Sequence, residues 1–242
     1  MILLSRRKSN LLTADNFDSK MLYITIITIA IINFIVKFKV FDNFLNYDMS
    51  IIAHVTNLYT YYKLLGLIIV AIVLSLSLVF RVYRYKQIPN INYVFVCIGF
   101  IIVATLISTV LSEQLYTSVW GFYSRTNGLL AYVSLFLIIY CISNFKVQTK
   151  HLSFLMQSIN IASILFVVIG IFQFFGLDIM NSHWFKQIYV PSEYKHLIDT
   201  INIMSIHFYG TQYSWAPSIL AQFNYFGGYC SIVYPIITAF AL

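Results

Sequence analysis

Charged residues are scarce in this chain. They make up only 10% of its 242 residues, whereas hydrophobic residues make up 60% and the mean hydropathy is +0.81. Soluble proteins carry about 25% charged residues. The deficit argues against an ordinary water-soluble domain and favours an integral membrane protein.

Cysteine is also rare, and its placement gives no sign of thiol chemistry. Cys97, Cys141 and Cys230 all lie within apolar runs, where a thiol behaves as a small hydrophobic group. The sequence contains no CxxC pair and no HExxH zinc signature. We therefore expect neither a metal site nor a cofactor.

Long apolar runs, in contrast, are abundant. Five complete runs, and a sixth that reaches the last residue, approach or exceed the roughly 20 residues that cross a bilayer as a helix. They cover about residues 21–36, 62–80, 91–111, 127–143, 152–176 and 217–242. We predict an all-α fold, a polytopic transmembrane helix bundle that forms a single membrane domain over residues 1–242. Residues 1–20 would form a polar cytoplasmic leader, and residues 177–216 a long outer segment.

The first and last runs carry expectations about processing. The first follows a basic leader but lacks a small-residue cleavage site, so we interpret it as an uncleaved anchor. The last ends on Phe240-Ala241-Leu242 without a polar or charged flank, whereas a final helix usually ends in such residues. We therefore expect either that the natural sequence continues beyond Leu242 or that the reading frame is truncated.

The positive charges are unevenly divided between the two predicted sides of the membrane. The net charge of +7 is by itself typical of a nucleic-acid-binding protein. With a cytoplasmic N-terminus, the inner side receives nine cations and two acids, and the outer side receives six of each. The excess then lies on the inner side, as the positive-inside rule requires. We expect a multi-pass protein of the cytoplasmic membrane, surrounded by membrane lipids and without a nucleic-acid partner.

Arg125 is the first candidate for a functional residue. It is the only arginine on the predicted outer side and it precedes the fourth apolar run. A guanidinium presents a planar set of donors that suits bidentate contact with phosphate, so Arg125 could hold the diphosphate of a lipid carrier. The alternative is an interfacial anchor that contacts lipid phosphates.

The long outer segment contains the second group of candidates. Glu193, His196 and Asp199 recur at helical spacing and could share one face. We favour an amphipathic surface helix with solvated charges over a metal site there. His183 or His207 could act as a general base near pH 7, and the spacing selects neither.

The last apolar run contains the third group. Gln222 and Asn224 precede Gly227-Gly228, and Pro235 follows. Amides within lipid need partners and often bond across helices, and a proline kinks a helix. Helix packing and substrate contact are both open for Asn224.

Two of these regions resemble the O-antigen ligase and polymerase family. The stretch Trp120-Gly121-Phe122-Tyr123-Ser124-Arg125-Thr126-Asn127-Gly128-Leu129-Leu130-Ala131-Tyr132 is similar to that family's outer-face motif. There, an aromatic-glycine stretch leads to an arginine, then to glycine-leucine and a hydrophobic helix. Gly210-Thr211, Asn224-Tyr225-Phe226-Gly227-Gly228-Tyr229 and Pro235 resemble the family's asparagine–tyrosine–glycine helix start and its helical proline. The chain departs from the family at Ala221-Gln222-Phe223, where members often have Gly-Asn-Pro.

The resemblance implies a membrane glycosyltransferase of the GT-C type. Such proteins use undecaprenyl-diphosphate-linked oligosaccharide at the outer face of the cytoplasmic membrane. Arg125 matches the family arginine near the diphosphate, and Asn224 matches the family asparagine. The family's principal catalytic arginine and histidine have no counterpart in these 242 residues, so we expect catalytic residues beyond Leu242 and no activity from this portion alone. The acceptor, the choice between ligase and polymerase, and the oligomeric state stay open.

Two other classes of protein also stay open. A polytopic transporter or lipid-linked glycan flippase would favour charged residues within its spans, whereas here nearly all charges lie at the ends of spans. A non-catalytic assembly subunit would bind a stable partner and would function without Arg125.

Overall fold

The computed structural model describes most of the predicted spans. It covers residues 2–35, 39–40, 56–57, 60–121, 126–175 and 182–190, together with residues 177, 179, 192, 195, 198, 230–231, 233–235 and 238. In the first helix, side chains are described from Thr13 onward.

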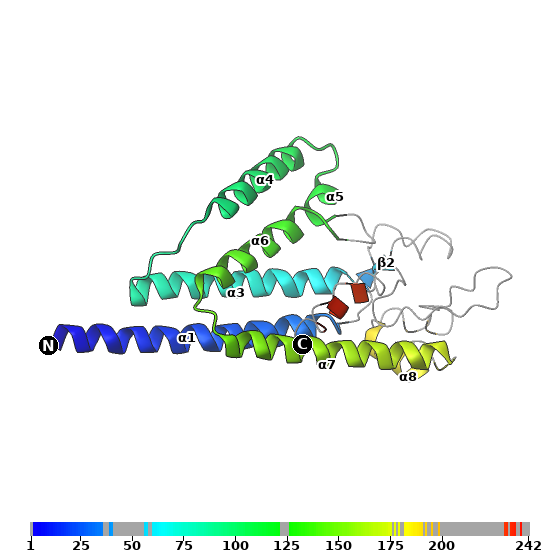
Figure 1. The fold of residues 1–242 in the computed structure, drawn as a ribbon. Coiled ribbons are helices and arrows are strands. Elements are labelled where there is room, and N and C mark those ends of the chain that lie inside the picture. The colour runs from blue at the N-terminus through cyan, green and yellow to red at the C-terminus, as the bar shows by residue number, and fades with distance from the viewer. Residues whose placement is uncertain are drawn as a thin grey trace.

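The described part of the chain is helical apart from two very short strands (Figure 1). The elements in chain order are α1 (Ile2–Ile32), β1 (Lys39–Val40), β2 (Thr56–Asn57), α3 (Tyr61–Tyr85), α4 (Tyr93–Val110), α5 (Leu115–Trp120), α6 (Leu129–Asn144), α7 (Thr149–Phe174) and α8 (His183–Tyr189). The two strands pair antiparallel, with Lys39 opposite Asn57. They lie between α1 and α3, in the segment that connects the first two apolar runs.

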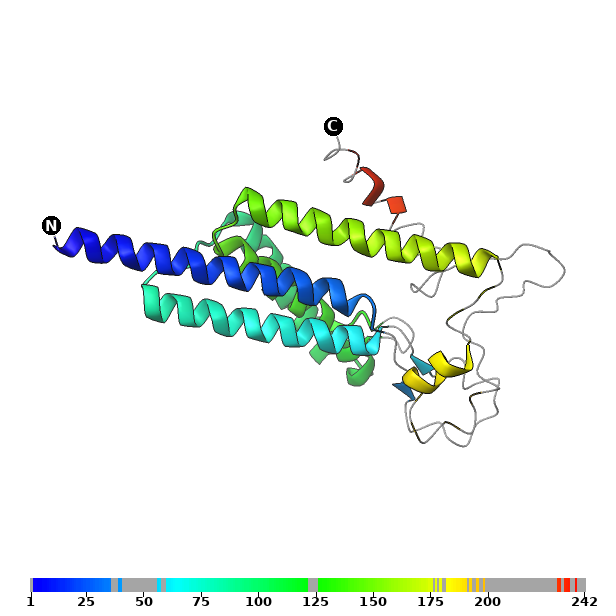
Figure 2. The same cartoon turned by 90° about the horizontal axis from the view of Figure 1, so that it is seen from below.

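The long helices lie side by side. Figure 2 shows α1 between α7 and α3, and α3 in turn packs against α6, which carries α4 on its outer side. Successive helices reverse direction, so that the end of α3, the end of α6 and the start of α7 gather beside the middle of α1 (Figure 1). This is the alternation expected when each helix crosses the same layer.

Three described helices are long and apolar enough to cross a membrane by length and composition: Tyr61–Tyr85, Tyr93–Val110 and Thr149–Gln173. The helix α4 is the clearest case, because it is apolar on all sides and Thr109 is its only buried residue. Phe100 is 71% exposed and Val110 is 72% exposed. Water solvates such a surface poorly, whereas an all-apolar helix is the usual form of a membrane span.

The core of the bundle lies between α1, α3 and α6. Its buried side chains are Leu22, Ile32, Val70, Ala71, Leu74, Leu78, Ile138, Cys141 and Phe145. Small residues bring the helices close together: a Cβ atom added to Gly66 would lie 3.0 Å from the side chain of Ile32. Close backbone approach at small residues is how helices gain contact area when lipid supplies no hydrophobic driving force.

Some of the predicted spans match helices of the structure, and others match only in part or lie outside the described residues. The runs at 62–80, 91–111 and 152–176 are confirmed as long apolar helices, α3, α4 and α7. The run at 127–143 forms α6, a shorter apolar helix of 16 residues. Most of the run at 217–242 lies outside the described residues, and its described positions at 230–231, 233–235 and 238 are helical.

The first run differs most from expectation. Instead of a helix over 21–36 preceded by a separate leader, α1 begins at Ile2 and ends at Ile32. The physical reason is that residues 1–35 contain neither glycine nor proline, the two residues least compatible with a helix interior. A rise in hydropathy indicates where a helix enters the membrane. The helix itself can begin earlier, in polar sequence, as α1 does.

Candidate functional site

The turn between α5 and α6 carries the segment that contains Arg125. Residues 122–125 themselves lie outside the described residues, but both flanks are described. The helix α5 ends at Trp120 and is followed by Gly121, whose φ of +91° favours glycine; Gly128 precedes the first residue of α6.

The two glycines lie against each other. A Cβ atom added to Gly128 would lie 2.3 Å from the backbone nitrogen of Gly121 and 2.5 Å from the carbonyl oxygen of Val119. A Cβ added to Gly121 would lie 2.3 Å from the backbone nitrogen of Asn127. Both positions therefore need glycine. We call this close approach of Gly121 to Asn127 and Gly128 the glycine-closed turn.

Aromatic rings attach this turn to the rest of the bundle. Trp120 stacks on Tyr61 in the first turn of α3, with ring centroids 5.8 Å apart. Tyr116 contacts the same indole at 6.4 Å. On the other flank, Thr126 is buried and has a φ of +45°. The residues on either side of 122–125 are thus held by packing.

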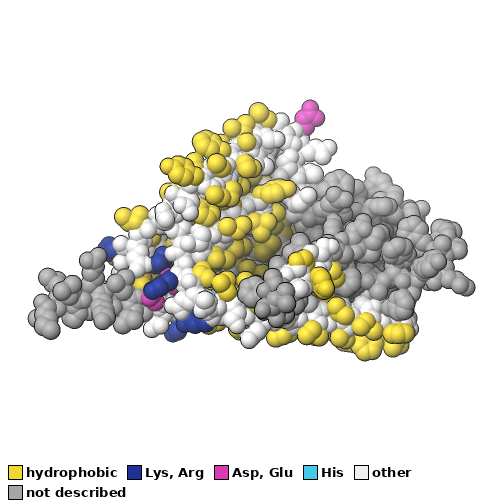
Figure 3. Space-filling view, viewed as in Figure 1, with side chains coloured by type: hydrophobic (Ala, Val, Ile, Leu, Met, Phe, Trp, Pro, Cys, Tyr) yellow, Lys and Arg dark blue, Asp and Glu magenta, His cyan; other side chains and the backbone are white. Residues whose placement is uncertain are grey.

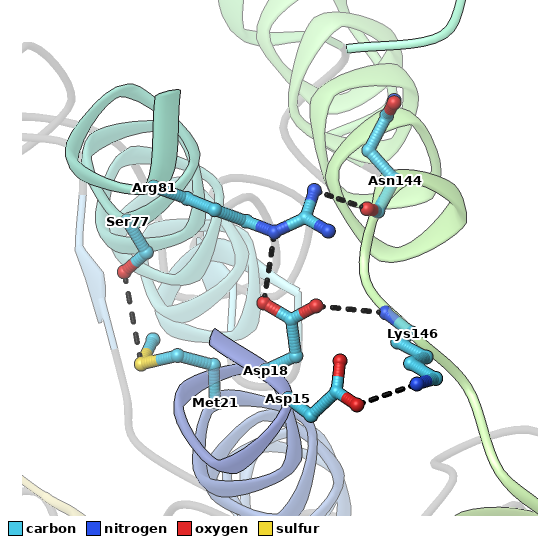
Figure 4. A network of polar contacts seen from close by, with 7 residues as sticks. All are labelled: Asp15, Asp18, Met21, Ser77, Arg81, Asn144 and Lys146. Carbon is cyan, nitrogen blue, oxygen red and sulfur yellow. Dashed lines mark hydrogen bonds and ion pairs between the residues drawn. The ribbon is translucent and has the colours of Figure 1, made fainter. Parts of the chain in front are cut away.

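A second polar site lies at the opposite end of α6 (Figure 4). Asp18 of α1 is fully buried, and its Oδ1 lies 3.0 Å from Nε of Arg81 near the end of α3. Its Oδ2 accepts a hydrogen bond of 3.0 Å from the backbone N–H of Lys146. Arg81 also donates from Nη1 to the carbonyl oxygen of Asn144, at 2.6 Å. We call this set of contacts the Asp18 junction.

The Asp18 junction joins segments that are far apart in the sequence. The side chain of Asn144 accepts a hydrogen bond from the backbone N–H of Asn90, between α3 and α4. At the rim, the ammonium of Lys146 pairs with Asp15. Burial raises the pKa of the Asp18 carboxyl, against the opposing effects of the Lys146 N–H and the Arg81 guanidinium. The carboxylate is retained by its partners, because an unpaired charge at that depth would be very unfavourable.

A serine–histidine contact lies beside the junction. Nε2 of His151 lies 2.7 Å from Oγ of Ser19, and Nδ1 of the same ring accepts the backbone N–H of Gln148 at 3.0 Å. Because Nδ1 is occupied as an acceptor, the neutral ring carries its proton on Nε2 and donates it to Ser19. A general base would need the reverse arrangement. This pair therefore holds α1 and the start of α7 together and does not form a nucleophile.

Most of the residues that the sequence nominated lie outside the described part of the chain. This holds for Arg125 and Asn224, for the acidic and histidine residues Glu193, His196, Asp199 and His207, and for Gln222. His183 is described: it opens α8 and its Nε2 lies 2.9 Å from the side-chain nitrogen of Gln187. Within the described residues, no three histidine, cysteine or acidic side chains are grouped as a metal site would require.

The sequence did not reveal the Asp18 junction or the Ser19–His151 contact. The available signal was sidedness, because Asp15, Asp18, Arg81 and Lys146 all fall on the predicted inner side. A pairing across more than 60 residues of sequence leaves no local pattern. Comparisons with protein-family models, with curated proteins and with solved structures find no match for this chain.

Proposed function

We propose that this chain is part of a membrane glycosyltransferase similar to O-antigen ligases and polymerases. It would lie in the cytoplasmic membrane with its N-terminus in the cytoplasm. It would transfer or polymerise undecaprenyl-diphosphate-linked oligosaccharide at the outer face. The three long apolar helices support the membrane location, and the likeness of Trp120–Tyr132 to the family motif supports the activity.

The observation that carries the proposal is the glycine-closed turn. The motif glycines, Gly121 and Gly128, touch in space and so fix the backbone on both sides of the segment that bears Arg125. The turn precedes α6, and the Asp18 junction follows it, so the two sites are separated by the whole helix. At 1.5 Å per residue, the 16 residues of α6 span about 24 Å. This separation supports the proposal that Arg125 and the inner cations lie on different faces of the hydrocarbon layer.

The chemistry asked of this part of the protein is recognition of charge. In the proposed reaction an acceptor hydroxyl attacks the anomeric carbon, and the carrier diphosphate leaves with the bonding electrons. A guanidinium at the diphosphate stabilises the developing negative charge, and its planar donors suit two phosphate oxygens at once. No described residue is assigned as the base that accepts the hydroxyl proton.

The test is a transfer assay in vesicles that contain the natural gene product and radiolabelled glycolipid. Charge-assisted hydrogen bonds contribute about 1.5–3 kcal/mol each, so Arg125→Ala should lower transfer roughly 10-fold to 100-fold. Arg125→Lys should recover only part of the rate, because an ammonium lacks the planar fork. Arg84→Ala, an exposed cation on the inner side, serves as the matched control.

The same assay separates the alternatives. Labelled glycan that crosses the membrane without forming a new glycosidic bond would identify a transporter or flippase. Unchanged transfer in Arg125→Ala, together with a partner that co-purifies in fixed proportion, would identify an assembly subunit. Either result would overturn the proposed role of Arg125.

A further inference from the structure

The short helix α8 exposes apolar side chains and buries a charged one. Trp184 is 60% exposed and Ile188 is 68% exposed, whereas Lys186 is only 6% exposed. In water the reverse is expected, because water solvates an ammonium well and an indole or an isoleucine side chain poorly. The exposed face of α8 therefore fits an apolar environment better than an aqueous one.

The side chains of α8 fall on three sides of the helix. Trp184 and Ile188 are four residues apart, so they lie on one face. His183 and Gln187 form a second exposed side that is polar, with Nε2 of His183 2.9 Å from the side-chain nitrogen of Gln187. Lys186 lies on the buried side. An apolar side next to a polar one is typical of a helix that lies in the plane of a membrane surface.

Apolar surface also continues from α7 towards α8. In the connection between the two helices, Phe175, Leu177 and Ile179 are all exposed. The backbone N–H of Leu177 donates to the carbonyl of Phe172 in the last turns of α7, at 2.9 Å. This bond keeps Leu177 beside the end of α7. The described part of the connection thus leads from a candidate membrane span to α8 through exposed apolar side chains.

The position of α8 along the bundle agrees with a membrane boundary. At the start of α7, His151 contacts Ser19 beside the Asp18 junction. Phe172 follows His151 by 21 residues, or about 32 Å at 1.5 Å per residue, and a hydrocarbon core is roughly 30 Å thick. When the junction lies at one boundary of the core, the end of α7 therefore lies at the other. Figures 1 and 2 both show α8 at this end, where α3 begins and α7 ends.

The distribution of side chains on the surface is consistent with this position. Figure 3 shows hydrophobic side chains over the last turns of α7, whereas the Lys and Arg side chains visible on that face lie at the opposite end of the bundle. Tryptophan is enriched where a membrane meets water, because its ring is apolar and its N–H can reach a polar partner. Trp184 is therefore a residue type expected at this level.

We propose that α8 lies in the membrane–water interface at this end of the bundle, with Trp184 and Ile188 inserted between lipid chains just below the head groups. His183 and Gln187 then face the water, and Lys186 faces the protein. The helix anchors the beginning of the segment 177–216 to the membrane surface. Because the contact is apolar, a zwitterionic phospholipid is sufficient. The inference requires a membrane location and is independent of sugar transfer.

The experiment measures the depth of Trp184 by fluorescence. The full chain carries Trp120→Phe and Trp215→Phe, so that Trp184 is its only tryptophan, and it is reconstituted into phosphatidylcholine vesicles. Quenching is compared for phosphatidylcholine brominated close to the head group, for phosphatidylcholine brominated near the end of the acyl chain, and for iodide in the water. We expect the first lipid to quench Trp184 at least twofold more strongly than the second, and iodide to quench it weakly.

A matched variant places the same fluorophore on the polar side of α8. It carries His183→Trp and Trp184→Phe in the same background, and we expect iodide to quench it at least twofold more strongly than it quenches Trp184. Three results would overturn the proposal: strong quenching of Trp184 by iodide without quenching by either lipid, equal quenching by lipid at positions 183 and 184, or protection of Trp184 from all quenchers, which would indicate contact with protein.

A second pair of variants serves if the single-tryptophan chain does not fold. Ile188→Cys and Gln187→Cys each carry a polarity-sensitive fluorophore in a chain whose native cysteines are changed to alanine. We expect blue-shifted emission that brominated lipid quenches at position 188 and not at position 187, and the same emission at both positions would count against the proposal. Because the readout is lipid contact, it is decided separately from the effect of Arg125→Ala on transfer.

Discussion

At its last residue α6 meets a buried ion pair, whereas immediately before its first residue the chain closes on two glycines. The Asp18 junction is held by the side chains of Asp18 (α1) and Arg81 (α3), which also bond to the backbone of Lys146 and Asn144, with contacts of 2.6–3.0 Å. The glycine-closed turn is held by backbone atoms in contact and by the Trp120–Tyr61 stack. The Asp18 junction depends on paired charges, and the glycine-closed turn depends on two residues without side chains. Removing a charge should therefore destabilise the first, and adding a methyl group should destabilise the second.

The largest expected effect comes from breaking the junction. Asp18→Ala leaves Arg81 without its buried partner, and loss of one member of a buried pair costs about 3–5 kcal/mol. We expect this loss in the free energy of unfolding, measured by denaturant titration in detergent. Asp15→Ala is the matched control, because Asp15 is only partly buried and pairs with an exposed lysine, so it should change stability by about 1 kcal/mol or less.

Replacing both members of the Asp18–Arg81 pair tests whether the loss in Asp18→Ala comes from an unpaired buried charge. Asp18→Leu with Arg81→Met removes both charges and replaces them with apolar groups of similar size, a change that is often neutral or stabilising. We expect the double variant to be much closer to the wild type than Asp18→Ala. Equal losses in the two variants would show that the junction does not act as a charge pair.

The second prediction breaks the glycine-closed turn. Gly128→Ala forces a Cβ to within 2.3 Å of the Gly121 nitrogen, and the backbone must move at a cost of about 1–3 kcal/mol. Gly99→Ala is the control, because an added Cβ there meets nothing within 4 Å and alanine favours the helix by roughly 0.5–1 kcal/mol. The two substitutions should shift the thermal midpoint in opposite directions, as followed by circular dichroism.

The smallest effect concerns the neighbour of the junction. Ser19→Ala removes the acceptor of the His151 proton, and a hydrogen bond contributes about 0.5–1.5 kcal/mol. Ser143→Ala, whose hydroxyl bonds only to the carbonyl of Tyr140 in its own helix, should have almost no effect. A larger loss at Ser143 than at Ser19 in the same unfolding assay would contradict the role assigned to the serine–histidine contact.

The sequence predicts the helices of this chain well and their contacts poorly. Hydropathy located α3, α4 and α7 within a few residues, because apolar length is a local property. It does not indicate where α1 begins, since polar residues such as Asn10 and Asp15 are tolerated in a helix that lacks glycine and proline. The run at 127–143 corresponds to a helix of 16 residues, which lies between Gly128 and Phe145, two residues with extended backbone.

The glycine-closed turn and the Asp18 junction show the same difference between what the sequence predicts and what it does not. The motif around Arg125 is visible in the sequence. The contact between Gly121 and Gly128 depends on backbone angles, which the sequence motif does not specify. The Asp18–Arg81 pair spans 63 positions and requires that α1 and α3 already be packed together. The sequence predicts Asp18 and Arg81 on the same side of the membrane, but their pairing is seen only once the helices are placed.

The predicted topology is tested most directly by the accessibility of positions 125 and 84 to a membrane-impermeant maleimide. Arg125→Cys and Arg84→Cys are introduced singly into a chain whose Cys97, Cys141 and Cys230 are changed to alanine, and intact cells are labelled before and after permeabilisation. We expect Arg125→Cys to react in intact cells and Arg84→Cys to react only after permeabilisation. Labelling of Arg84→Cys in intact cells with protection of Arg125→Cys would contradict both the topology and the proposed contact with the lipid carrier.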